Sequence, residues 1–392
     1  MFNVIVSFSR TPIGSFLGSL SSISSSNLGA IAIKGTISKV NIDSELINQV
    51  IMGNVLSAGV GQAPARQAAI YAGLPNSVQC LTINKMCGSG LQSIMLADQL
   101  IKNDSNKIII AGGMENMSQA PHYLLNSRTG TRLGEGKLID GMIVDGLWDV
   151  YNDKHMGNCA EMCAEKYSIS REEQDEFAIR SYERSQASIS DGTFEKEIVP
   201  VELNNKKETI TVDRDEEPGR VSFEKLRTLR SIFQKDGTVT AGNASTINDG
   251  AAACLIMSEE KSKELGVKAL AHIVDYTSHS HEPEWFTTAP IFSIEKLLKK
   301  QNLQTSDIDL FEINEAFSVV ALAAIKKLNL DIQKVNPYGG AVSLGHPIGA
   351  SGARIMCTLL NAMEHKNKKM GISSICIGGG EASSMLVRRV EG

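Results

Sequence analysis

The chain has 392 residues, more than one hydrophobic core usually holds, so we expect two or three subdomains. Hydrophobic residues make up 42% and charged residues 21%, which is typical of a globular protein that folds in water. The net charge of −5 argues against nucleic acid or an anionic membrane surface as the main partner.

The first 14 residues predict a strand and a turn, and they lack the basic start and long apolar stretch of a secretory signal. No apolar run approaches the roughly 20 residues that span a bilayer. Seven cysteines are scattered along the chain without a Cys-x-x-Cys pair. We therefore expect a cytoplasmic protein without membrane contact, in which most cysteines are buried apolar residues.

Short β-branched runs bounded by glycine predict buried strands at 50–53, 107–113, 310–313 and 374–378. Helical patterns lie between them, as at 91–101. This alternation predicts an α/β fold with mostly parallel sheets and helices on their faces.

A weak internal repeat divides the chain. Cys87-Gly-Ser-Gly90 opens a predicted helix that leads to a strand ending at Glu115, and Gly349-Ala-Ser-Gly352 opens another that leads to a strand before Glu381. We predict two similar halves, 1–117 with 248–268 and 269–392. The charged residues 118–247, with a capping box at Ser170, predict an insertion over the surface that carries ligand contacts.

Cys87 lies at a predicted strand-to-helix turn. The free N–H groups and the dipole of a helix N-terminus favour a thiolate, and the glycines that follow allow a ligand close approach. Cys87 is therefore a candidate nucleophile, although a buried structural cysteine fits the same local pattern. His346 lies in the equivalent turn of the second half, held outside the next helix by Pro347. Its imidazole could take a proton from a thiol or donate to an oxyanion.

Cys376 lies on a predicted strand before Gly378-Gly379-Gly380, a turn whose N–H groups could stabilise an oxyanion. Asn314 ends another predicted strand and could hold a water in a cleft. His155, Cys159 and Cys163 have helical spacing, but with no fourth ligand nearby we do not expect a metal site there.

Together these segments resemble the thiolase family over nearly the whole chain. The matching motifs are 84–90 (NKMCGSG), 111–118 (AGGMENMS), 241–245 (AGNAS), 248–253 (NDGAAA), 314–317 (NEAF), 345–352 (GHPIGASG) and 376–380 (CIGGG). The resemblance implies the layered αβαβα thiolase fold, with two α/β halves and an inserted loop domain. It also implies lipid metabolism, including the supply of isoprenoid precursors.

The resemblance implies a role for each candidate. Cys87 would become acylated after activation by His346, and Cys376 would remove the α-proton of a second acetyl-CoA. Asn314, through a water, and His346 would stabilise the enolate. The N–H groups of Cys87 and Gly378 would hold the thioester oxyanion. The products are acetoacetyl-CoA and CoA, reached by ping-pong kinetics.

The closest similarity is to the short-chain branch that acts on acetoacetyl-CoA. His155 and Met156 would border a small acyl pocket, and Ser245 would contact the pantetheine arm. Arg220, Ser222 and Lys225 lie where relatives contact the CoA nucleotide, although this charged stretch also reads as a solvated face. No tightly bound cofactor is implied. Potassium binds in some relatives at the positions of Tyr182, Ala241, Gly242, Ala244 and Val342, where Gly242 replaces an alanine but keeps a backbone carbonyl.

Family members are homodimers or homotetramers. One departure is Glu381, where relatives of this kind carry a small or apolar residue; we expect its carboxylate to raise the pKa of Cys376. Two alternatives stay open: a β-ketoacyl synthase, and a non-catalytic acyl-CoA-binding module on the same scaffold.

Overall fold

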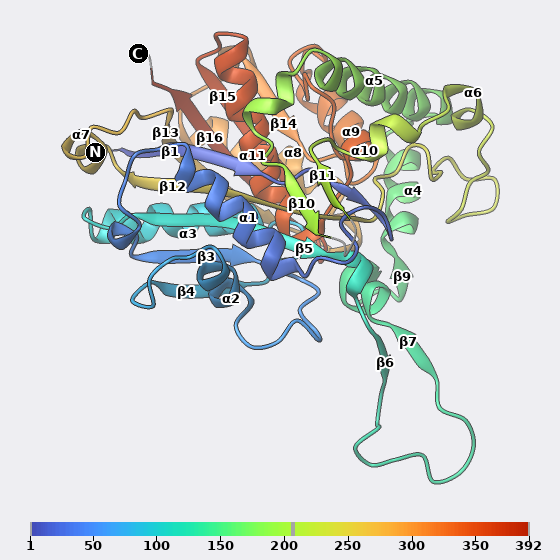
Figure 1. Ribbon diagram of the computed structural model, residues 1–392. Helices are drawn as coiled ribbons and strands as arrows, with labels where there is room; N and C mark the ends of the chain where they lie inside the picture. The colour runs from blue at the N-terminus through green and yellow to red at the C-terminus, as the bar shows by residue number, and fades with distance from the viewer. Residues whose placement is uncertain (1, 205–207, 391–392) are drawn as a thin grey trace.

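The computed structural model describes residues 2–204 and 208–390 (Figure 1). The strands of the main sheet are β1 (Asn3–Arg10), β2 (Gly14–Ser15), β3 (Gln49–Gly53), β4 (Gln79–Ile83), β5 (Ile109–Asn116), β12 (Asn248–Ser258), β13 (Ala271–Ser280), β14 (Leu310–Ile313), β15 (Met370–Ile377) and β16 (Glu381–Arg389). Three small hairpins are formed by β6 (His122–Leu124) with β7 (Leu138–Asp140), β8 (Trp148–Asp149) with β9 (Lys154–His155), and β10 (Val201–Asn204) with β11 (Thr209–Val212).

The α-helices are α1 (Ser25–Ser38), α2 (Pro64–Tyr71), α3 (Ser89–Asn103), α4 (Met156–Lys166), α5 (Arg171–Ser190), α6 (Phe223–Leu226), α7 (Glu259–Glu264), α8 (Ala289–Lys300), α9 (Ser318–Leu328), α10 (Ala341–Leu344) and α11 (Ile348–His365). The strands predicted at 50–53, 107–113, 310–313 and 374–378 correspond to β3, β5, β14 and β15, and the helix predicted at 91–101 lies within α3. The capping box predicted at Ser170 begins α5.

The strand order is β14-β15-β16-β13-β1-β12-β5-β3-β4, and it repeats one pattern on either side of the β1–β13 junction. In the first half, β5 pairs in parallel with β3 and antiparallel with β12, and β12 pairs antiparallel with β1. In the second half, β15 pairs in parallel with β14 and antiparallel with β16, and β16 pairs antiparallel with β13. This arrangement bears out the two similar α/β halves.

The prediction of mostly parallel sheets is wrong. Parallel pairing joins only β3 with β4, β3 with β5, and β14 with β15, among the paired strands of this sheet. The turn at Gly378–Gly380 is short enough to make β15 and β16 an antiparallel hairpin. β12 follows the long insertion and returns antiparallel to β5.

The helices form layers around the two halves of the sheet. α1 and α2 cover the outer face of the first half, α8 and α9 cover the second, and α3 and α11 lie between them. The two inner helices meet main chain to main chain, because a Cβ added at Gly90 would lie 2.6 Å from the backbone nitrogen of Ala353. At Gly352 it would lie 2.3 Å from that of Leu91. Only glycine allows this approach.

The residues between β5 and β12 extend over the surface. α4 and α5 pack on α9 of the second half, whereas β6 and β7 form a long arm that projects from the body (Figure 1). Within the described ranges, no helix combines the length and the apolar character needed to cross a bilayer.

Candidate active site

A cavity of about 670 Å³ is lined by both halves and by the insertion. Its wall contains these residues singled out in the sequence: Cys87, His155, Met156, Arg220, Ala241, Ala244, Ser245, His346 and Gly378. The inner helices position two of them, since Cys87 precedes α3 and His346 precedes α11. The internal repeat thus brings its two equivalent turns to one cavity.

The turn that carries Cys87 is tightly folded. Met86 adopts a left-handed conformation with φ of 47°, and the hydroxyl of Ser89 accepts a hydrogen bond from the backbone N–H of Lys85 at 2.8 Å. Burial raises the pKa of the Cys87 thiol to about 11, even though the backbone N–H of Gly378 donates a hydrogen bond to its sulfur. The thiol is therefore protonated at neutral pH and needs a base to become a nucleophile.

The imidazole of His346 is held in one tautomer. The Ser351 hydroxyl donates its only proton to the carbonyl of Pro347 at 2.8 Å, so it accepts from Nδ1–H of His346, 2.5 Å away. Nε2 then carries the lone pair, 3.5 Å from the side-chain nitrogen of Asn314. Burial lowers the pKa of His346 to about 3, with a smaller effect from Arg354. At neutral pH the imidazole is therefore uncharged, and Nε2, whose lone pair faces Asn314, is the atom that can accept a proton.

Cys376 and Asn314 are fully buried and adjoin residues of the cavity wall: Asn314 contacts His346, and Cys376 lies two residues before Gly378. Burial raises the pKa of the Cys376 thiol, and negative charge on the Cys87 sulfur raises it further. The side-chain oxygen of Asn314 is buried without a hydrogen-bond partner among the described residues. Buried acceptors are normally paired, so this oxygen is available to a water or a ligand.

The expected effect of Glu381 on Cys376 is wrong. The carboxylate of Glu381 pairs with the ammonium group of Lys85, and the pKa of Cys376 is raised by burial and by Cys87. The ammonium group of Lys85 offsets the negative charge of Glu381.

Aromatic rings form one side of the cavity. The His155 ring stacks on Phe233 with centroids 4.8 Å apart, and Phe233 meets Phe317 edge to face at 6.1 Å. His155 also caps α4, where its Nδ1 accepts from the backbone N–H of Gly157. Gly157 has no side chain where the Phe233 ring packs, since an added Cβ would lie 2.3 Å from it.

The remaining predicted ligand residues lie outside the cavity wall. Ser222 and Lys225 are exposed at α6. Tyr182 and Val342 pack in one buried cluster, and Gly242 packs against Leu226 of the same cluster.

Several residues of the wall were not predicted, among them Phe16, Phe233 and Phe286. No matching motif contains them. The sequence around an aromatic residue on a loop does not reveal whether its side chain faces a cavity or a core. Ser351 lies inside a matching motif, but its role depends on a proton that no spacing reveals.

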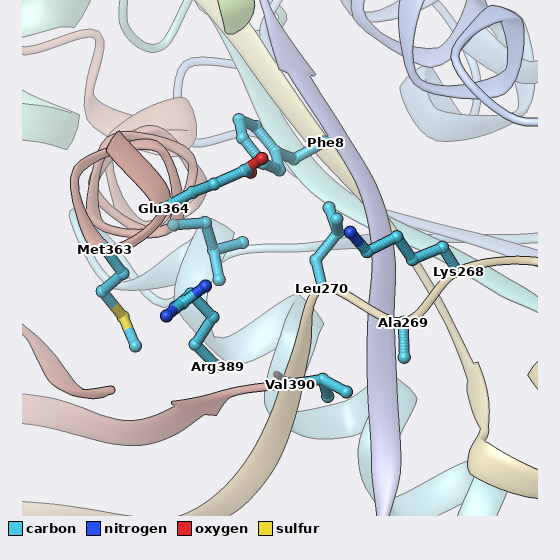
Figure 2. A pocket seen from close by; sticks show the side chains of 9 residues that line it. Phe8, Lys268, Ala269, Leu270, Met363, Glu364, Arg389 and Val390 are labelled. Atoms are coloured by element: carbon cyan, nitrogen blue, oxygen red, sulfur yellow. The ribbon is translucent and has the colours of Figure 1, made fainter. Parts of the chain in front are cut away.

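A smaller cavity and the cysteines of α4 lie outside the wall of the active-site cavity. A cavity of about 50 Å³ lies between Phe8, Met363, Glu364 and Arg389 (Figure 2). Within the described ranges, no cluster of three His, Cys, Asp or Glu residues is arranged to hold a metal, and Cys159 and Cys163 are buried in α4.

Known proteins resemble this chain over its whole length. Residues 3–260 match the thiolase N-terminal domain and residues 267–389 the thiolase C-terminal domain. Acetyl-CoA acetyltransferase 2 of Arabidopsis thaliana is 52% identical over 98% of this chain and 96% of its own length. A mitochondrial acetyl-CoA acetyltransferase of Bos taurus is 52% identical over 99% and 91%. The crystal structure of the Acat5 thiolase of Ascaris suum in complex with coenzyme A superposes with a TM-score of 0.94, at 43% identity and full coverage of both chains. The chain belongs to the thiolase family.

Proposed function

We propose that this chain is an acetyl-CoA C-acetyltransferase, which joins two acetyl-CoA molecules into acetoacetyl-CoA and CoA and catalyses the reverse thiolysis. The observation that carries the proposal is the meeting of Cys87, Gly378 and His346 at one cavity, with the buried Cys376 on β15 two residues before Gly378. Relatives at about half identity are named for the same activity.

In the first half-reaction, Nε2 of His346 accepts the proton of Cys87, and the sulfur attacks the acetyl carbonyl. The N–H groups of Cys87 and Gly378 stabilise the oxyanion, and CoA leaves with the proton of the Cys376 thiol, which becomes a thiolate. In the second, the Cys376 thiolate takes the α-proton of another acetyl-CoA. The enolate, held by His346 and a water on Asn314, attacks the acetyl group, and the Cys87 sulfur that is freed takes its proton back from His346.

The aromatic wall beside His155 and Met156 supports a short acyl chain, because rings that pack on one another would limit the room for a longer one. Ser245 and Arg220 line the cavity, where they would contact the pantetheine arm and the nucleotide; Ser222 and Lys225 would extend that contact at the surface. A chain-length series of 3-ketoacyl-CoA substrates tests this. Preference for chains longer than five carbons would contradict it.

Replacing the second cysteine tests the chemistry. Cys376→Ala should abolish condensation while Cys87 is still acylated by acetyl-CoA, which mass spectrometry of the intact protein detects. Cys87→Ala should remove both. Condensation by Cys376→Ala would favour a β-ketoacyl synthase mechanism, and binding of acetoacetyl-CoA without turnover by the unaltered protein would favour a binding module.

A potassium site at Tyr182, Ala241, Gly242, Ala244 and Val342 is part of the proposal. Burial raises the pKa of the Tyr182 hydroxyl, and the carboxylates of Glu217 and Glu315 raise it further; negative charge of this kind suits a cation. The Tyr182 hydroxyl and the backbone carbonyls of the other four would hold it. Higher activity in potassium than in sodium buffer at equal ionic strength is the expected result.

We also propose a cytoplasmic homo-oligomer, a dimer or tetramer. Each of the seven cysteines is a free thiol, which suits a reducing compartment, although relatives are named as cytosolic and as mitochondrial. The arm exposes Leu124, Leu125, Leu133 and Leu138 by 48 to 96%, an apolar surface that a second copy would cover. Light scattering of the protein with and without the arm tests this.

A further inference from the structure

An ion pair joins two turns that are far apart in the chain. Lys85 lies two residues before Cys87, and Glu381 lies three residues after Gly378. The ammonium group of Lys85 contacts the carboxylate of Glu381, with side-chain exposures of 28% and 33%. Neither residue lines the large cavity, so their role is not contact with substrate there.

Both turns rely on backbone conformations that few side chains support. Met86 has φ of 47°, and Gly379 and Gly380 have φ of 93° and 86°. Left-handed conformations outside glycine are strained and persist only when their surroundings hold them. The triple-glycine turn has no side chains of its own, and its far end is held by the His281 N–H, which donates to the Gly380 carbonyl at 2.9 Å.

The ends of the two turns are nevertheless fixed. Lys85 is tied to its turn because its carbonyl accepts from the backbone N–H of Gly88 at 3.1 Å. Glu381 pairs with Ile377 across the β15–β16 hairpin, so it marks the end of the glycine turn. The Lys85–Glu381 ion pair therefore connects the start of the Cys87 turn to the end of the glycine turn that carries Gly378.

We propose that the Lys85–Glu381 ion pair is a latch that holds the two backbone N–H groups of the oxyanion site, those of Cys87 and Gly378, at a fixed separation. Lys85 and Glu381 are positioning residues, and their effect on rate rests on the function proposed above. The latch acts in acylation and in condensation, because both steps place a carbonyl oxygen between these groups.

The test is a charge cycle on the full-length protein. Lys85→Met and Glu381→Gln should each lower kcat for thiolysis of acetoacetyl-CoA about fivefold with KM for CoA nearly unchanged, since a partly exposed pair couples by less than tenfold. The reversed pair, Lys85→Glu with Glu381→Lys, should recover most of the loss. Amide hydrogen exchange of residues 377–381 should be faster in both single variants and slow again in the reversed pair.

A matched control breaks a remote ion pair. Glu364→Gln removes the partner of Lys196, a pair 2.5 Å apart on the surface of α11, and should leave kcat and the exchange of residues 377–381 unchanged. Single variants with unaltered kcat and unaltered exchange would overturn the latch. A reversed pair whose kcat and amide exchange are no closer to those of the unaltered protein than in the single variants would also overturn the latch. The exchange measurement needs no turnover, so an inactive parent protein would contradict the proposed function and leave the latch to be judged by exchange alone.

Discussion

At the scale of single residues, the protonation of His346 depends on one hydroxyl. Ser351 accepts from Nδ1–H only because its own proton is donated to the Pro347 carbonyl. This chain of two hydrogen bonds leaves Nε2 as the basic atom that faces Asn314 and the cavity. Without the hydroxyl, the proton could move to Nε2, and the imidazole could no longer accept one from Cys87.

Ser351→Ala should therefore slow acylation of Cys87 about 10- to 100-fold, the usual effect of removing a group that orients a functional histidine. Ser351→Thr keeps a hydroxyl and should recover much of the rate. The measurement is the rate of acetyl transfer to Cys87 in a single turnover, compared with the thermal midpoint. A loss of rate that follows the loss of stability in both variants would contradict the tautomer argument.

The pH dependence of Cys87 reactivity follows from its raised pKa. Below a pKa of about 11, the thiolate fraction of the free enzyme rises about tenfold for each pH unit. Alkylation of Cys87 by iodoacetamide, followed by mass spectrometry, should therefore accelerate steadily from pH 7 to pH 9. A rate that is level across this range would mean that the sulfur is already ionised at pH 7.

The chemistry-bearing residues could be predicted because several motifs that match the thiolase family contain them, whereas the local pattern around Cys87 alone also fits a structural cysteine. Cys87, His346 and Gly378 fall on one cavity, as their turns suggest. What sequence could not predict is how charge and protons are distributed. The carboxylate of Glu381 was expected to act on Cys376, but it is offset by Lys85, a residue almost 300 positions away.

At the scale of elements, the turn between β15 and β16 contains two glycines whose surroundings differ. A Cβ at Gly380 would lie 2.5 Å from the carbonyl oxygen of His281 and 2.7 Å from that of Glu282. At Gly379 it would meet no atom within 4 Å, although φ is 93°. The two glycines share a left-handed backbone but differ in the space around them.

This contrast gives a matched pair of variants. Gly379→Ala should destabilise the fold by about 1–2 kcal/mol through backbone strain alone. Gly380→Ala should cost clearly more, because backbone atoms on both sides must shift. Chemical denaturation of the two variants in parallel measures the difference, and equal losses would show that the close approach to 281–282 is relieved without cost.

Strands and helices were predictable individually because short β-branched runs and capping residues are local signals. Their pairing was not, since the direction of β12 depends on where the chain re-enters the sheet after more than a hundred residues of insertion. The short glycine turn after Cys376 could have indicated a hairpin, but the same sequence is also compatible with a strand-to-helix connection.

At the scale of the whole molecule, a buried ionic cluster ties the insertion to the first strand. The guanidinium of Arg10 binds Asp215 through two hydrogen bonds of 2.6 and 2.8 Å and Glu197 through one of 2.6 Å. All three side chains are fully buried. Asp215 lies shortly before Glu217 and Arg220, which line the large cavity, so the cluster anchors that part of its wall.

Asp215→Asn should destabilise the protein by about 3–5 kcal/mol, because it leaves the Arg10 charge only partly compensated in the interior. Asp213→Asn is the control, since Asp213 is exposed and lies 3.9 Å from its partner Arg214; it should change stability by less than about 0.5 kcal/mol. Urea unfolding measures both, and an unchanged midpoint for Asp215→Asn would contradict an anchoring role.

The main-chain contact between α3 and α11 has a consequence for how the enzyme tolerates change. Cys87 and His346 stand at the entrances of these two helices, one from each half, and their spacing is set where Gly90 and Gly352 touch the opposite backbone. A contact between two backbones does not depend on which side-chain rotamers fill the core. Substitutions elsewhere in the core can therefore lower the stability of the protein while the Cys87 thiol and the His346 imidazole stay aligned. We expect such substitutions to lower the melting temperature well before they lower the turnover rate.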